Sequence, residues 1–178
     1  DGNAANTNTS VFETGTLGNS ITSTTNGIGV VSKGEKATVN ILSNGINLAG
    51  HSALNAGSLG VFIEDSNINN AGTIETGDYG TAVYLKGNSA ARNIALGGFK
   101  TGNNGVGIYL ENQNIIDSIS SITTGTNGIA VYSKNGDVDL NVLNSGLFTL
   151  GAGSTGYFLE NSTLRTSLGT ANVTLGND

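Results

Sequence analysis

The sequence predicts an all-β fold in which short parallel strands stack into a solenoid, a parallel β-helix. A motif of a small residue, an apolar residue, a large residue, another core-type residue and a lone charge occurs six times. The copies begin at positions 29, 60, 82, 107, 130 and 156, so they recur every 22 to 31 residues, a repeat length typical of solenoids. Glycine, asparagine, serine and threonine supply about half of the 178 residues, and these residues favour turns.

The composition distinguishes the chain from disordered low-complexity sequences. Disordered segments usually combine high net charge with few β-branched residues, whereas here only 11% of residues are charged and Val, Ile and Thr fall at regular positions. Proline is absent, as expected if nearly every backbone N–H is needed in an interior strand. We therefore expect a folded stack of strands.

Each motif copy is expected to form a strand whose successive side chains point to opposite faces. One set is aliphatic, and the other contains the small residue, the large residue and the charge. In three copies the aliphatic set is Ile28, Val30 and Ser32; Thr81, Val83 and Leu85; and Val106, Ile108 and Leu110. Because burying a lone charge costs several kcal/mol, we expect the aliphatic set to face the core and the other set to face outward.

Two further sets of short strands are expected after the motif copies. The second set includes Val39 and Ile41, Ile94 and Leu96, and Leu140 and Val142; the third includes Ile46 and Leu48, Ile74, Ile122, and Leu147 with Leu150. Two or three such strands, joined by turns rich in glycine and asparagine, fill one coil of about 25 residues, which we call a rung. About seven rungs would occupy residues 1–178 as a single domain.

The rungs alternate in kind. Residues 30–45 match 131–146 without a gap, and residues 62–68 match 109–115. The sequence repeat is therefore a pair of rungs, in which a Lys rung precedes a Glu rung. The resulting column of charges is Lys33, Glu64, Lys86, Glu111, Lys134 and Glu160.

Charge and composition exclude several classes of partner and site. The net charge is −6 and the seven basic residues are scattered, which argues against binding to nucleic acid or an anionic membrane surface. The absence of cysteine excludes disulfides and thiolate metal sites. No segment has the pattern of a signal peptide or the length of a membrane helix, so we expect no direct membrane insertion. The chain starts and ends within the repeat pattern, and we interpret it as a segment of a longer protein.

The predicted outward columns are the candidate ligand-binding surface. The column of rings consists of Phe62, Tyr84, Tyr109, Tyr132 and Phe158. Exposed rings can bind sugars or an apolar partner surface, but aligned rings on neighbouring strands also stabilise one another, and we favour this structural role. For the charges, of which Lys86, Glu111 and Lys134 belong to the candidate surface, we also favour mutual pairing over ligand binding.

A catalytic role has weaker support. Some β-helix proteins are carbohydrate-active enzymes, which need converging carboxylates, and off the charge column only Asp137 and Asp139 lie close together on one strand face. His51, the single histidine, is expected in a loop without a catalytic partner. The segment Gly105-Val106-Gly107 lacks the helix that a phosphate-binding loop requires. We expect no catalytic residue, metal site or cofactor.

The strings Asn104-Gly-Val-Gly-Ile-Tyr-Leu-Glu-Asn112 and Asn127-Gly-Ile-Ala-Val-Tyr-Ser-Lys-Asn135, with their linkers rich in Gly, Asn and Thr, resemble the passenger repeats of type V autotransporter adhesins, especially fusobacterial-type ones. The resemblance covers nearly the whole chain. It implies a right-handed parallel β-helix that is secreted and held at the outer-membrane surface by a C-terminal β-barrel of the same polypeptide.

The resemblance also implies a function. The expected role is that of an adhesin shaft, and the expected partner is a protein or glycan on the surface of host cells or other bacteria. A purely structural spacer is the first alternative, and a carbohydrate-active β-helix enzyme is the second.

Overall fold

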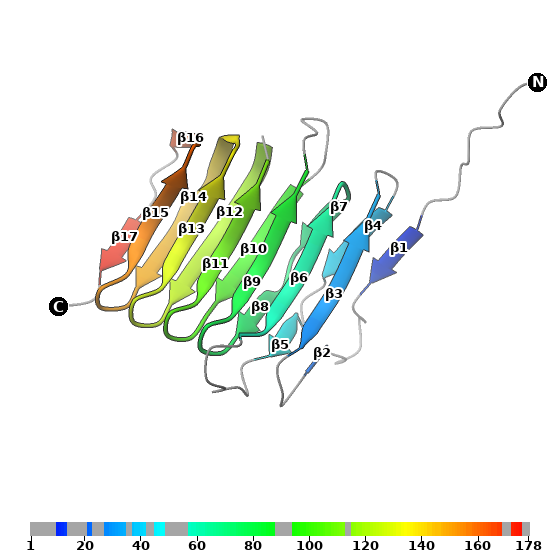
Figure 1. The fold of residues 1–178 in the computed structure, drawn as a ribbon, viewed down its shortest axis with the longest axis horizontal. Coiled ribbons are helices and arrows are strands. Elements are labelled where there is room, and N and C mark those ends of the chain that lie inside the picture. Colours follow the sequence, from blue (N-terminus) through cyan, green and yellow to red (C-terminus); the bar gives the residue numbers. More distant parts are fainter. Residues whose placement is uncertain are drawn as a thin grey trace, which may run out of the picture.

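The computed structural model describes residues 10–13, 21–22, 27–34, 37–41, 45–48, 57–87, 94–112, 115–168 and 172–175. The regular elements there are all β-strands, and each strand pairs in parallel with its neighbours. The strands lie side by side along the long axis of the molecule (Figure 1). This arrangement confirms the predicted parallel β-solenoid, while the number of about seven rungs stays a prediction. No helix among the described residues is long and apolar enough to cross a membrane.

The six motif copies form one parallel sheet. In chain order its strands are β3 (Ile28–Lys33), β6 (Leu59–Glu64), β9 (Thr81–Lys86), β11 (Val106–Glu111), β13 (Ile129–Lys134) and β15 (Thr155–Glu160). Equivalent motif residues are paired throughout, as in the column that joins Glu64, Lys86 and Glu111. The sequence spacing therefore predicted both these strands and their register.

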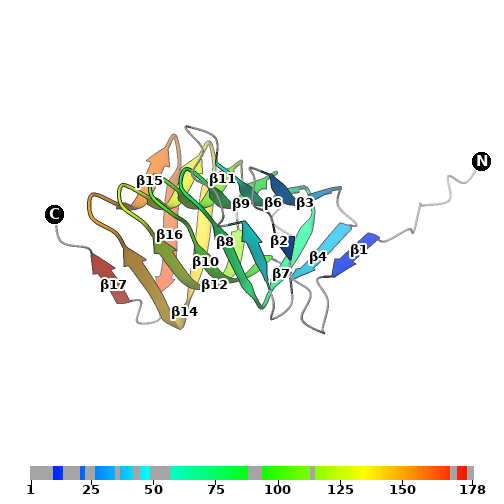
Figure 2. The same ribbon diagram turned by 90° about the horizontal axis from the view of Figure 1, so that it is seen from below.

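The remaining strands form an 11-stranded sheet with two rows, shown below the motif sheet in Figure 2. The first row comprises β1 (Ser10–Glu13), β4 (Ala37–Ile41), β7 (Asn67–Asn70), β10 (Ile94–Lys100), β12 (Ile115–Thr124), β14 (Asp137–Leu150) and β16 (Thr163–Leu168). The second row comprises β2 (Ile21–Thr22), β5 (Ile46–Leu48), β8 (Thr73–Thr76) and β17 (Asn172–Leu175), with the second halves of β10, β12 and β14. Both predicted sets of additional strands are thus present.

The longest strands differ from the expectation of short separate ones. The strand β10 pairs with β7 through its first residues and with β8 through its last, so it passes through a corner without a break. Gly97 lies at this corner, where an added Cβ would be 2.6 Å from the Gly72 carbonyl oxygen. Between β12 and β14 the register shifts near Ile119, which marks the same corner. Because the backbone stays extended there, two predicted strands merge into one.

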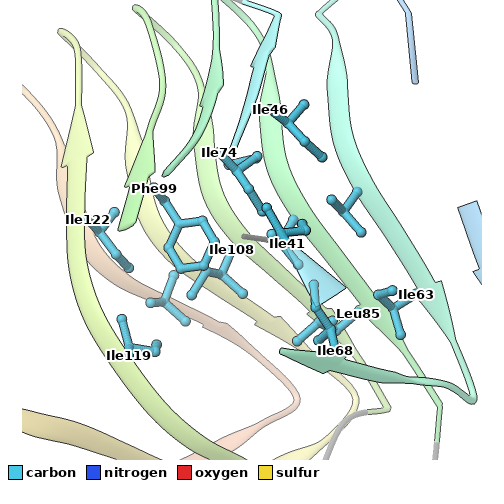
Figure 3. Close-up of a cluster of buried hydrophobic side chains, with 14 of the residues drawn as sticks. Ile41, Ile46, Ile63, Ile68, Ile74, Leu85, Phe99, Ile108, Ile119 and Ile122 are labelled. Atoms are coloured by element: carbon cyan, nitrogen blue, oxygen red, sulfur yellow. The ribbon is translucent and has the colours of Figure 1, made fainter. Parts of the chain in front are cut away.

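The core is a set of columns between the two sheets (Figure 3). In one column the paired residues of successive rungs are Ile46, Ile74, Phe99, Ile122 and Phe148, and each is at most 2% exposed. From the motif sheet, Val83, Leu85, Ile108 and Leu110 are fully buried. Burial of one such side chain contributes about 1.5–3 kcal/mol of stability, so these columns stabilise the stacking of the rungs.

The start of the motif strands corrects one prediction. The small residue was expected to face outward, yet Ala82 and Ala130 are fully buried and Thr81 is only half-buried. The strand leaves a corner at this point, and the small residue lies against the second row: a Cβ on Gly107 would be 2.8 Å from Cγ2 of Ile122 and 2.7 Å from the Ala130 carbonyl oxygen. From the third motif residue onward the side chains alternate inward and outward as predicted.

Left-handed residues recur at the two corners that flank the motif sheet. Before the motif strands they are Tyr79, Asn104, Asn127 and Gly153, with φ between 54° and 68°. After the strands they are Gly34, Asp65, Gly87, Asn112, Asn135 and Asn161. Glycine and asparagine tolerate this conformation better than other residues, which explains why they occupy most of these corner positions.

Candidate functional site

The predicted aromatic column is continuous. Phe62, Tyr84, Tyr109, Tyr132 and Phe158 lie at equivalent positions of β6, β9, β11, β13 and β15. Neighbouring ring centroids are 4.6 to 5.0 Å apart, with interplanar angles of 71° to 89°. We call this set the aromatic ladder. Edge-to-face pairs of this kind contribute about 0.5–1.5 kcal/mol each beyond area burial, so the ladder stabilises the stack whether or not it binds a ligand.

The charges form a second column beside the rings. Nζ of Lys33 lies 2.8 Å from Oε2 of Glu64, and Nζ of Lys86 lies 3.8 Å from Oε1 of the same carboxylate. Farther along, Nζ of Lys134 is 3.1 Å from Oε1 of Glu160. These side chains are partly exposed, and such ion pairs usually contribute about 0–1 kcal/mol each.

Hydrogen bonds tie the two columns together. The Tyr84 hydroxyl donates to Oε2 of Glu111, and the Tyr132 hydroxyl donates to Oε2 of Glu160. In both cases a tyrosine on a Lys rung reaches the carboxylate of the following Glu rung. The residue after Phe62 in the charge column is Lys86, whose ammonium could not accept such a bond. The choice between Tyr and Phe was therefore a signal in the sequence that the prediction missed.

These contacts change the protonation equilibria of the groups. Burial, followed by the hydrogen bond to Glu111, raises the pKa of Tyr84. The bond to Glu160 raises the pKa of Tyr132, and the bonds from Tyr132 and Lys134 lower the pKa of Glu160. The hydrogen bond with Glu160 also raises the pKa of Lys134. These side chains thus form hydrogen bonds and ion pairs with one another along the axis. Binding of a ligand by them stays a prediction.

Tyr109 departs from this pattern, because it is the one tyrosine of the aromatic ladder on a Glu rung. Within the described part of the chain, its hydroxyl has no hydrogen-bond partner. Tyr109 and Tyr84 line a pocket of about 270 Å³ beside the ladder. The other described lining residues are Gly57, Ser58, Leu59, Tyr79 and Thr81.

Tyr79 is a site residue that the sequence analysis missed. It occupies the third position of the turn Gly77-Asp-Tyr-Gly80, where the corresponding turns Gly102-Asn-Asn-Gly105 and Gly125-Thr-Asn-Gly128 carry asparagine. It is 45% exposed. The sequence signal that could have identified Tyr79 is a bulky residue at a turn position where the two corresponding turns have asparagine.

The sequence also offered weaker candidates, and the structure describes some of them. Asp137 and Asp139 lie in β14, where they pair with Thr163 and Arg165. His51 lies outside the described residues. The segment Gly105-Val106-Gly107 enters the strand β11 and so does not form a phosphate-binding loop, which requires a helix. Among the described residues, no group of three or more His, Cys, Asp or Glu side chains could hold a metal ion.

Comparisons with protein-family models, with curated proteins and with solved structures each found no match. The resemblance to autotransporter passenger repeats therefore rests on the sequence motifs alone.

Proposed function

We propose that the chain is a shaft segment of an autotransporter-type surface protein, located outside the outer membrane, that takes part in adhesion to host cells or other bacteria. In this proposal the solenoid is right-handed, as crossovers between parallel strands almost always are, and it comprises about seven rungs. The rest of the passenger and a C-terminal β-barrel would belong to the same polypeptide. The partner would be a surface protein or glycan.

The observation that carries the shaft role is the continuity of the aromatic ladder. Rings contact one another across all five strands from β6 to β15. Ion pairs and hydrogen bonds such as that from Tyr84 to Glu111 link the same rungs at the next column. Because each rung of a solenoid contacts only its neighbours, columns that run along the axis favour a stiff, extended rod.

A purely structural spacer is the second candidate. The same contacts favour this role, because rings that pack on one another and charges that pair with one another are less available to bind a partner protein or glycan. A carbohydrate-active enzyme is supported less well. Such an enzyme needs free converging carboxylates, whereas Glu64, Glu111 and Glu160 are each held by a lysine or a tyrosine.

The adhesion proposal is tested by coating beads with the purified segment and measuring attachment to host cells and to partner bacteria. We expect attachment that saturates and that soluble segment inhibits. Beads coated with heat-denatured segment are the control for nonspecific adsorption. If folded segment, verified by its circular dichroism, attaches to neither cell type, the adhesion role of this segment is wrong and the spacer is favoured.

A further inference from the structure

We propose that the pocket lined by Tyr79, Tyr84 and Tyr109 binds one neutral sugar ring. This inference goes beyond the shaft role, because it assigns a ligand to one defined place on the rod. It also departs from the prediction that the whole aromatic ladder is the binding surface. Of the five ladder rings, the pocket uses two and adds a third tyrosine from a corner.

The first argument is the conformation of Tyr79. Its φ is 58°, and the equivalent residues Asn104 and Asn127 have φ of 54° and 55°. The backbone N–H groups of all three donate to the next rung over 2.8 Å, so the turns are equivalent. A bulky residue rarely adopts this left-handed backbone, and strained residues of this kind tend to occur at functional sites. Tyr79 thus has a backbone conformation that is unfavourable for a bulky residue, and its half-exposed side chain lines the pocket.

The second argument is the hydroxyl of Tyr109. Phenylalanine occupies this column on the two other Glu rungs, at Phe62 and Phe158. The hydroxyl of Tyr109 does not serve the ladder, because the next charge is Lys134 and no described residue hydrogen-bonds to it. In this proposal the Tyr109 hydroxyl, which has no partner in the described part of the chain, pairs with the ligand. Two unrelated exceptions to the repeat, Tyr79 and Tyr109, meet at the same pocket.

The backbone of the preceding rung closely approaches the Tyr79 turn. Gly57 is the neighbour of the Tyr79 turn, since a Cβ on Gly57 would lie 1.7 Å from the Tyr79 carbonyl oxygen. Only a glycine permits this close approach, which places the start of the preceding rung at the wall of the pocket. Ser58, which follows it, also lines the pocket, and its buried Oγ has no hydrogen-bond partner among the described residues.

The chemistry of the wall selects the ligand class. Rings and an aliphatic side chain, Leu59, provide apolar surface, whereas Thr81 and Tyr109 provide hydroxyl groups. None of the described lining residues is charged. A neutral pyranose has the matching surface, since its C–H groups pack on aromatic rings and its hydroxyls pair with uncharged donors and acceptors. The volume of about 270 Å³ is near the lower limit of ligand pockets, about 300 Å³, which fits one ring.

The test measures binding of methyl glycosides of galactose, glucose and N-acetylgalactosamine to the purified segment by saturation-transfer NMR. Tetramethylammonium and sialic acid serve as cationic and anionic probes. We expect transfer to at least one neutral glycoside. The substitution Tyr79→Asn restores the repeat residue, so it should preserve folding and weaken binding about tenfold or more, since an aromatic contact of about 1.4 kcal/mol corresponds to a factor of ten.

Two phenylalanine variants provide the matched comparison. Tyr109→Phe keeps the ring and should weaken binding, whereas Tyr132→Phe removes a hydroxyl outside the pocket and should bind as the unsubstituted segment does. The proposal is overturned if no neutral glycoside binds, if Tyr79→Asn binds unchanged, or if only a charged probe binds. Glycoside binding by a segment whose coated beads attach to no cell would support the pocket and contradict the adhesion role, so the two proposals fail separately.

Discussion

The hydroxyl of Tyr84 donates a hydrogen bond to the carboxylate of Glu111, which lies on the next strand of the motif sheet. Tyr132 and Glu160 repeat this relationship two rungs farther along. The recurrence shows that the ring column and the charge column act as one unit with a period of two rungs.

Removal of the Tyr84 hydroxyl should destabilise the solenoid. A hydrogen bond to a charged group contributes about 1.5–3 kcal/mol when buried, and because this bond is partly exposed we expect Tyr84→Phe to lower the free energy of unfolding by about 1 kcal/mol. Urea denaturation followed by circular dichroism measures the change. Tyr109→Phe removes a hydroxyl without a described partner and should stay within about 0.5 kcal/mol of the unsubstituted segment. Equal losses in the two variants would contradict the assignment.

Reversal of one charge should have an effect that depends on salt. Glu111→Lys places an ammonium between Lys86 and Lys134 in the charge column, and it also removes the acceptor of the Tyr84 hydroxyl. We expect the melting temperature to fall more in low salt than in high salt, because screening weakens the repulsion.

The matched control for this charge reversal is Glu111→Gln, which keeps an acceptor oxygen without the charge. It should lose less stability than Glu111→Lys and should depend less on salt. If the loss for Glu111→Lys is the same at both salt concentrations, the charge column contributes nothing through its alternation.

High pH should weaken the folded state through Tyr84. Its pKa is raised in the folded protein, so the contribution to stability is complete below the unfolded pKa of about 10 and is lost as the pH rises through the folded value. Urea midpoints measured from pH 8 to strongly alkaline conditions should therefore decline above about pH 10. The decline should be smaller for Tyr84→Phe, and an identical decline would show that this group does not contribute.

Low pH should destabilise the folded state through Glu160. Bonds from Tyr132 and Lys134 lower the pKa of this carboxyl in the folded state, so its contribution is present above the unfolded pKa and is lost as the pH falls through the folded value. The unfolding midpoint should fall at acidic pH, and Glu160→Gln should reduce this dependence. A pH profile that Glu160→Gln leaves unaltered would contradict the effect.

An added methyl group at the corner should be costly inside the stack and cheap at the described C-terminal end. A Cβ on Gly60 would lie 2.4 Å from both the Ala82 carbonyl oxygen and Cγ2 of Ile74, and we expect Gly60→Ala to cost about 1–3 kcal/mol from overpacking. Among the described residues, a Cβ on Gly156 would contact only Cδ1 of Leu150, at 3.7 Å, so Gly156→Ala is the matched control. Thermal unfolding measures the melting temperatures of both variants. Similar decreases in the two would contradict the prediction and would mean that the corner at Gly60 can move to accommodate the methyl group.

The sequence predicted the features that repeat. Spacing alone identified the motif strands and placed Tyr84 beside Tyr109 and Lys86 beside Glu111, because equivalent residues of a solenoid stack in register. It did not predict the burial of Ala82, because alternation along a strand cannot show where the chain leaves a corner. The sequence also did not predict that Tyr79 and Tyr109 line one pocket. Each residue departs from the repeat at a different position, so the spacing of the repeat does not relate them.

The alternation of the charge column also affects how the chain can misfold. If one rung were omitted from the stack, Lys33 would face Lys86, or Glu64 would face Glu111, and like charges on adjacent strands repel each other. The aromatic and aliphatic columns would still match, since their residue types are nearly the same in every rung. Stacking of a rung on its correct neighbour therefore pairs opposite charges, whereas stacking that skips a rung pairs like charges. The charges thus disfavour an assembly error that the packing of the core would tolerate.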